Sequence, residues 1–123
     1  TQFFNAAPMA AALATLDELE KIDGAEKISE TGRQLNAGLI DVAASHGYDL
    51  VVTGVPGMPY YRNGGDGGFA RHTQWVSECV KRGAYLLNYH NNFVSTAHTE
   101  EDLQRTWAIA DEAFAALPRL GET

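Results

Sequence analysis

The chain carries LVVTGVPGMPYY at residues 50–61, two short apolar stretches on either side of a Pro-Gly pair. The first stretch, Leu50 to Val55, is rich in β-branched residues, which favour strands, and Pro56-Gly57 is typical of a turn. Met58 to Tyr61 then follows as a second apolar stretch. We therefore expect these two pieces to be neighbouring strands of one sheet.

Helical patterns lie on both sides of this stretch. Apolar residues recur at three- and four-residue spacing in four segments, which predicts helices over about residues 7–22, 28–45, 70–82 and 100–117. Thr99 and Asp102 form a variant of the capping box at the start of the last helix. Gly32 and Gly38 are expected to weaken the second helix locally.

Two further segments complete the outline of the fold. Residues 63–68, Asn-Gly-Gly-Asp-Gly-Gly, have too few apolar side chains to pack and are expected to form a mobile loop. Residues 84–87 form a short apolar run, which predicts another strand. Few short strands separated by helices indicate an α+β fold, in which helices cover one face of a three- or four-stranded sheet.

Composition limits the classes of function. The chain has 123 residues and a net charge of -7 with no basic cluster, which argues against nucleic-acid binding. Its single cysteine, Cys79, lies in an apolar helical pattern and is expected to be a small buried side chain in a reducing compartment. No apolar run approaches the roughly 20 residues of a membrane span. We expect a cytoplasmic protein with no membrane partner.

The residues by themselves predict no catalytic constellation. The glycine-rich loop lacks the spacing and the Lys-Ser/Thr pair of a phosphate-binding loop. His90 and His98 have no carboxylate or thiol at a recognised metal spacing, so no metal is expected. Asn5 stands just ahead of the first helix, where it is either a simple N-cap or part of an anion site. Residues 88–92, Asn-Tyr-His-Asn-Asn, offer several donors and acceptors on one loop.

Two passages carry a resemblance to a known family: TQFFNAAPMAAALATL at residues 1–16 and FVSTAHTEED at residues 93–102. Together they resemble the C-terminal part of class III aminotransferases, which use pyridoxal 5'-phosphate (PLP) and include the glutamate-1-semialdehyde aminomutases. The resemblance implies the small domain of a fold type I transferase, whose large domain would be α/β. Residues 1–22 would then be a helix linking to the missing large PLP-binding domain, and residues 23–123 the small α+β domain.

The resemblance also implies a cofactor contact at the start of the chain. Thr1 stands eight residues before Met9, as a threonine does in the family, where its hydroxyl binds the phosphate of PLP in the neighbouring subunit of a homodimer. Asn5 matches a position that is often asparagine, whereas the proline that commonly follows is Ala6 here. The lysine that carries PLP in the family lies upstream of Thr1. Accordingly, we expect no catalytic residue in this chain and no activity of the chain alone.

The implied substrate pocket is bordered by the loop ahead of Phe93. In several relatives this loop supplies an arginine for a substrate carboxylate, but here it offers Tyr89, His90 and Asn91. The residue that binds a substrate carboxylate is therefore left open, with Arg62 and Arg71 as candidates. The implied activity moves an amino group between an amine or amino acid and a keto or aldehyde acceptor. The alternatives are a glutamate-1-semialdehyde 2,1-aminomutase and, from another class, a free-standing α+β binding module.

Overall fold

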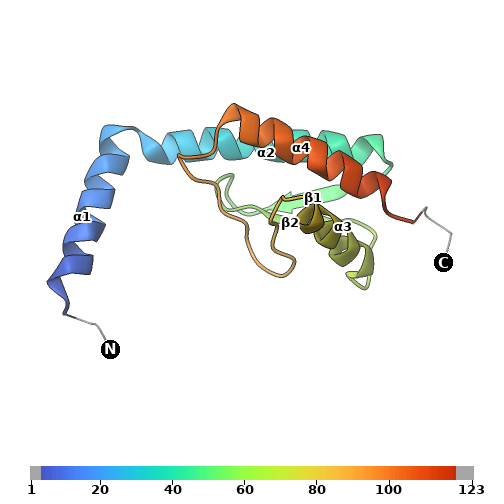
Figure 1. The fold of residues 1–123 in the computed structure, drawn as a ribbon, viewed down its shortest axis with the longest axis horizontal. Coiled ribbons are helices and arrows are strands. Elements are labelled where there is room, and N and C mark those ends of the chain that lie inside the picture. The colour runs from blue at the N-terminus through green and yellow to red at the C-terminus, as the bar shows by residue number, and fades with distance from the viewer. Residues whose placement is uncertain (1–3, 119–123) are drawn as a thin grey trace.

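The computed structural model describes residues 4–118, which form four helices and two strands. Helices α2 and α4 lie side by side over the sheet, and α3 contacts both α4 and β2 (Figure 1). Helix α1 projects away from this body and contacts only α2 among the described elements. The elements are α1 (Ala6–Lys21), α2 (Gly24–Ser45), β1 (Leu50–Thr53), β2 (Tyr60–Asn63), α3 (Ala70–Lys81) and α4 (Glu100–Ala115).

The two strands of residues 50–63 pair as the sequence predicts. β1 and β2 are antiparallel, with Leu50 opposite Asn63 and Thr53 opposite Tyr60. The α+β class is confirmed, but the predicted three- or four-stranded sheet is wrong for residues 4–118, where the sheet has two strands.

The predicted strand at residues 84–87 is also wrong, because its backbone groups bond locally. The amide of Ala84 donates to the carbonyl of Cys79 at 3.0 Å, and the amide of Leu86 donates to that of Ala84 at 3.1 Å. A later segment lies along the strand connection instead. The amide of Asn92 donates to the carbonyl of Pro59 at 2.8 Å, and the amide of Val94 to that of Gly57 at 2.9 Å.

The predicted helices all form, and their ends have local causes. The second helix begins at Gly24, four residues before its predicted start at Ile28. Asp23 adopts the left-handed conformation, with φ of 53°, and turns the chain between α1 and α2. Gly24 then lies against Leu19, where an added Cβ would come within 2.5 Å of Leu19 Cδ2. The early start of α2 thus depends on a glycine at the inside of a tight corner.

The capping box predicted at the start of α4 is confirmed. The amide of Asp102 donates to Thr99 Oγ1 at 3.3 Å, and the amide of Thr99 donates to Asp102 Oδ2 at 2.8 Å. The bond from the Thr99 amide above all, together with a bond from the Thr99 hydroxyl, holds the pKa of the Asp102 carboxyl below its usual range. A cap of this kind contributes about 1 kcal/mol of stability. It fixes the point at which the loop of residues 84–98 enters the last helix.

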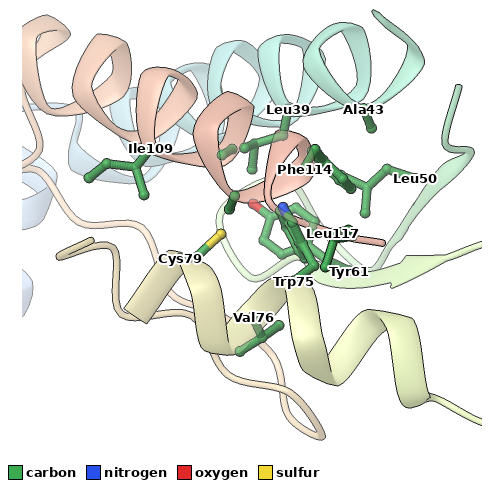
Figure 2. Close-up of a cluster of buried hydrophobic side chains, with 12 residues drawn as sticks. Leu39, Ala43, Leu50, Tyr61, Trp75, Val76, Cys79, Ile109, Phe114 and Leu117 are labelled. Atoms are coloured by element: carbon green, nitrogen blue, oxygen red, sulfur yellow. The ribbon is translucent and has the colours of Figure 1, made fainter. Parts of the chain in front are cut away.

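The hydrophobic core lies where α2, α3, α4 and the sheet meet. Trp75 is fully buried and stacks on Phe114, with ring centroids 4.9 Å apart (Figure 2). Leu39 and Tyr61 bring the side chains of α2 and β2 to the same cluster. Cys79 is fully buried as predicted, and burial raises the pKa of its thiol to about 12, so it behaves as an unreactive apolar side chain.

Candidate functional site

The loop of residues 88–92 is anchored at both ends. At one end, Asn88 Nδ2 donates to Thr73 Oγ1 on α3 at 2.8 Å. At the other end, Asn92 Oδ1 accepts from the backbone amide of Leu87 at 2.9 Å, and the backbone amide of Asn92 donates to the carbonyl of Pro59. Two asparagines therefore hold the loop against α3 and the strand connection, and the residues between them are presented from a fixed base.

Tyr89, His90 and Asn91 lie together on this loop. Tyr89 is 73% exposed, and the rings of His90 and Phe93 are 6.1 Å apart. Asn91 Nδ2 donates to the carbonyl of Met58 at 3.3 Å, which leaves its Oδ1 without a hydrogen bond among the described contacts. The loop thus presents aromatic and polar groups that no other part of residues 4–118 covers fully.

Of the two candidate arginines, Arg62 lies near this loop. Its guanidinium stands over the ring of Phe69, with Cζ 4.0 Å from the ring centroid, and Nη2 donates to the carbonyl of Asp66 at 3.1 Å. Phe69 in turn lies 5.5 Å from the ring of Tyr89. We call Arg62, Phe69 and Tyr89 the aromatic-arginine cluster. It joins the end of the glycine-rich loop to the loop of residues 88–92.

Phe69 is a residue that the sequence analysis missed. It has a positive φ of 61° at the N-cap position of α3, which is uncommon for a bulky side chain. The contacts with Arg62 and Tyr89 offset that cost. The available signal was a single aromatic residue between a glycine-rich stretch and a helix, which by itself does not show what the ring contacts.

Arg71, the other candidate, belongs to a different part of the molecule. Its Nη1 donates to Tyr48 Oη at 3.3 Å and to the carbonyl of Pro118 at 3.0 Å. Tyr48 stacks on Phe114, so Arg71 ties the end of the described chain to the core. The structure therefore brings Arg62, and not Arg71, toward the candidate loop.

The start of α3 carries two groups with shifted pKa values. The amide of His72 donates to Asp66 Oδ2 at 2.9 Å, and this bond above all keeps the pKa of the Asp66 carboxyl below its usual range. The His72 ring is fully buried, and burial lowers its pKa, although the backbone of Asn88 opposes the shift. His72 is therefore neutral in the folded chain near neutral pH.

This burial predicts a specific loss of stability in mild acid. The pKa of His72 is lower in the folded state than in the unfolded state. Its contribution to the free energy of unfolding is therefore complete above the unfolded-state pKa of about 6.5, and it is lost as the pH falls from there. We expect the free energy of unfolding, measured with urea, to fall between about pH 7 and pH 5, before the carboxyls of the unfolded chain titrate near pH 4. The His72→Leu variant should lose most of that decrease.

An unchanged slope of stability against pH in His72→Leu would contradict this assignment. His46→Gln is the matched control. His46 Nε2 lies 2.8 Å from Asp111 Oδ1 on the surface between α2 and α4, so its replacement leaves the buried ring in place. The decrease that His72 causes should persist in that control variant.

At the other end of the chain, Asn5 caps α1. Its Oδ1 accepts from the amide of Ala7 at 3.2 Å, as the simple N-cap interpretation expects. The first turn contains no acidic side chain, so the positive end of the helix dipole is not neutralised there. Thr1, the predicted cofactor contact, lies outside the described residues.

Helix α1 has an exposed apolar stripe formed by Met9, Leu13 and Leu16. These side chains are 51%, 63% and 62% exposed, and no residue of α1 is buried. Spacings of three and four residues place them on one face of the helix. An apolar stripe on a projecting helix is typical of a surface that packs against further protein.

A pocket in the described part of the chain lies away from the candidate loop residues. It has a volume of about 550 Å³ and is open to solvent, between the N-terminal half of α4 and the segments 83–86 and 92–98. None of Tyr89, His90 and Asn91 lines it. The predicted site residues therefore share a surface loop, and this pocket lies elsewhere.

The lysines occupy solvated positions, as expected from the sequence. Lys21 pairs with Glu18 at 3.2 Å, Lys81 pairs with Glu78 at 2.6 Å, and Lys27 is exposed on α2. Over residues 4–118 there is no group of three His, Cys, Asp or Glu side chains that could hold a metal ion. In the same range, no helix has the length and apolarity needed to cross a lipid bilayer.

Comparison with known proteins connects this fold to enzymes. The chain is 38% identical, over 95% of its length, to an aminopentol aminotransferase of Sphingopyxis macrogoltabida. It is 32% identical, over 93% of its length, to a glutamate-1-semialdehyde 2,1-aminomutase of Pyrobaculum islandicum. This chain is a homologue of one segment of such aminotransferases and aminomutases. The resemblance seen in the sequence is thereby confirmed, although no family model matches the chain.

A solved structure agrees with this segment in three dimensions. The PLP internal aldimine form of the FumI protein of Sphingopyxis sp. MTA144 matches 92% of the chain with a TM-score of 0.88 and 38% identity. The chain covers 27% of that protein, and it spans 28% and 30% of the two curated relatives described above. The α+β segment thus corresponds to one part of that longer, PLP-bound protein.

Proposed function

We propose that this chain is the C-terminal part of a PLP-dependent class III aminotransferase, which moves an amino group from an amine or amino acid to a keto or aldehyde acceptor. The observation that carries the proposal is the match of 92% of the chain, at 38% identity, to a structure that holds PLP. Both an aminopentol aminotransferase and a 3-aminobutyryl-CoA aminotransferase are among its relatives. The protein would work in the cytoplasm, for which the single buried Cys79 is support.

In this proposal α1 links the described body to a large PLP-binding domain. The exposed stripe of Met9, Leu13 and Leu16 supports it, because these side chains have no apolar cover in residues 4–118. Residues 1–22 would be the link, and residues 23–123 the small domain. A free-standing binding module explains this stripe less well, since an isolated domain rarely leaves a whole helix without a buried residue.

The start of α1 fits a phosphate contact. Its first turn carries no acidic side chain, and helix N-termini favour anions. We propose that the hydroxyl of Thr1 donates to the phosphate of PLP bound to the neighbouring subunit of a homodimer, which orients the cofactor. PLP, when bound, supplies an electron sink for the carbon that carries the amino group. The lysine that carries the cofactor would come from outside this chain, because Lys21, Lys27 and Lys81 are solvated.

The loop of Tyr89, His90 and Asn91 would form part of the substrate-pocket wall. Its two asparagine anchors support this role, because they hold the exposed groups in a fixed position. Arg62 would supply the contact to an anionic substrate group. In support, its guanidinium lies over the ring of Phe69, which is 5.5 Å from the ring of Tyr89, whereas Arg71 is bound to Tyr48 and Pro118.

The test uses the purified protein that contains this sequence together with the rest of its chain. We expect it to be yellow with bound PLP, to lose that colour on addition of an amino donor, and to regain it with a keto acceptor. Thr1→Val should weaken PLP binding roughly 10- to 100-fold, the value of a hydrogen bond to a charged group, and Thr1→Ser should restore it. Thr15→Val is the control, since Thr15 bonds to its own helix at the carbonyl of Ala11.

The same preparation separates the aminotransferase from the aminomutase alternative. One aminomutase among the relatives, from Methanococcoides burtonii, is 37% identical to the chain, so this alternative has direct support. A transferase requires an acceptor and releases a ketone or aldehyde from the donor. A mutase converts glutamate-1-semialdehyde to its isomer without an added acceptor. A colourless protein with neither activity would overturn the proposal.

A further inference from the structure

Asn63-Gly64 is the only Asn-Gly pair in the sequence. An asparagine followed by glycine deamidates more readily than other asparagines, because glycine has no side chain to hinder attack by its own backbone nitrogen. The other five asparagines are followed by alanine, tyrosine, asparagine or phenylalanine: Asn5, Asn36, Asn88, Asn91 and Asn92. Chemistry therefore singles out Asn63 as the reactive position in an unfolded chain.

The folded structure protects this pair in two ways. The side chain of Asn63 is 1% exposed, and both of its amide atoms are buried. The amide of Gly64, which contains the attacking nitrogen, donates to the carbonyl of Asp49 at 2.5 Å. That bond belongs to the end of the β1–β2 ladder, where Leu50 and Asn63 are partners. Attack therefore requires this end of the ladder to open.

The chain beyond Asn63 is suited to local opening. An added Cβ at Gly65, Gly67 or Gly68 would meet nothing within 4 Å, so these residues have no packing partners on that side. Segments with few packed contacts open at lower free energy than the core. The contacts that resist opening include the bond from Gly64 to Asp49, the bonds that Asp66 accepts from His72 and Arg62, and the Arg62–Phe69 contact.

We propose that Asn63 is a deamidation site controlled by opening of the ladder end, and that its reaction prevents the segment from closing again. In the opened segment the backbone nitrogen of Gly64 attacks Cγ of Asn63, a C–N bond forms, and Nδ2 leaves as ammonia. Water then hydrolyses the resulting succinimide ring at either carbonyl, which gives aspartate or isoaspartate. The inference does not depend on the proposed aminotransferase activity.

The product cannot return to the native position at low cost. Aspartate would place a carboxylate at a site that is 1% exposed and offers no hydrogen-bond partner to the side chain among the described residues. Isoaspartate adds a backbone atom and would shift the register of β2. Both products therefore favour the opened segment.

The test compares folded and urea-unfolded chain in the same mildly alkaline buffer, with peptide mass analysis that separates aspartate and isoaspartate. In urea we expect Asn63 to react faster than the other five asparagines. In the folded chain its rate should fall at least roughly 100-fold, as for exchange that requires segment opening. Equal deamidation rates at Asn63 in the folded and unfolded chain would show that folding does not protect it. A rate in urea no faster than that of Asn91 would show that Asn63 is not the most reactive asparagine.

A second measurement addresses the failure to close. Asn63→Asp should unfold at a lower urea concentration than the unmodified chain, and its 64–69 segment should exchange amide hydrogens faster. Gln74→Glu is the matched control, because it adds the same charge at an exposed position on α3. If Asn63→Asp matches Gln74→Glu in both measurements, the carboxylate is accepted in the closed site and the proposal fails.

Discussion

Replacement of Trp75 by alanine is expected to lower the free energy of unfolding by about 3–5 kcal/mol. Trp75 is fully buried and stacks on Phe114 of α4, with the two rings inclined by 20°. It also lies 5.9 Å from the ring of His72, so its loss leaves a cavity between α3 and α4. Urea unfolding followed by circular dichroism measures the change.

Two further variants make the Trp75 result interpretable. Tyr85→Ala removes an aromatic ring that is 80% exposed and should change stability by at most about 0.5 kcal/mol. Trp75→Phe keeps a ring against Phe114 and removes the buried Nε1, which has no hydrogen-bond partner among the described residues, so it should cost less than alanine. A loss for Trp75→Ala no larger than that for Tyr85→Ala would show that Trp75 does not support the core.

Replacement of Gly32 by alanine is expected to destabilise the chain by about 1–3 kcal/mol, although alanine is the better helix former. Gly32 is buried in the middle of α2, and an added Cβ would lie 2.1 Å from the carbonyl oxygen of Pro56. Because the obstacle is backbone, α2 or the strand connection must move. The urea midpoint should therefore fall.

The variant Ala37→Gly on the same helix separates the effect of helix propensity on stability from the effect of packing. Ala37 is exposed, so its replacement should cost only the propensity difference of about 1 kcal/mol. If propensity alone governed α2, Gly32→Ala would gain the same amount. A stabilised Gly32→Ala variant would thus contradict the close approach of α2 to Pro56.

The two glycines within α2, Gly32 and Gly38, have contacts that the sequence does not predict. Gly32 and Gly38 were expected only to weaken the second helix. In the structure the carbonyl of Pro56 packs directly against Gly32, and the indole of Trp107 packs directly against Gly38. A Cβ added to Gly38 would lie 2.3 Å from the indole. Trp107 then donates to the carbonyl of Leu35 at 3.1 Å. Helix propensity depends on the residue itself, whereas these contacts involve segments more than twenty residues away.

The candidate site, too, could be predicted only in part from the sequence. The sequence identified the loop of Tyr89, His90 and Asn91 but offered Arg62 and Arg71 as equals. The structure distinguishes them, because the ring of Phe69 lies against Arg62 and 5.5 Å from Tyr89, whereas Arg71 is bound to Tyr48 and Pro118. The missing strand at residues 84–87 is a similar case, since a short apolar run does not specify a partner.

By itself, the sequence determined the four helices, the presence of two neighbouring strands within residues 50–63, the cap at Thr99 and the relationship to aminotransferases. These features depend on local periodicity, on turn and cap chemistry, and on motifs that are contiguous in the chain. The tertiary structure alone decided the two-stranded sheet, the tight contacts of Gly32 and Gly38, the position of Arg62 and the burial of Asn63. Each of these features depends on which segment, distant in the sequence, packs against the residue, and no local sequence pattern specifies that contact.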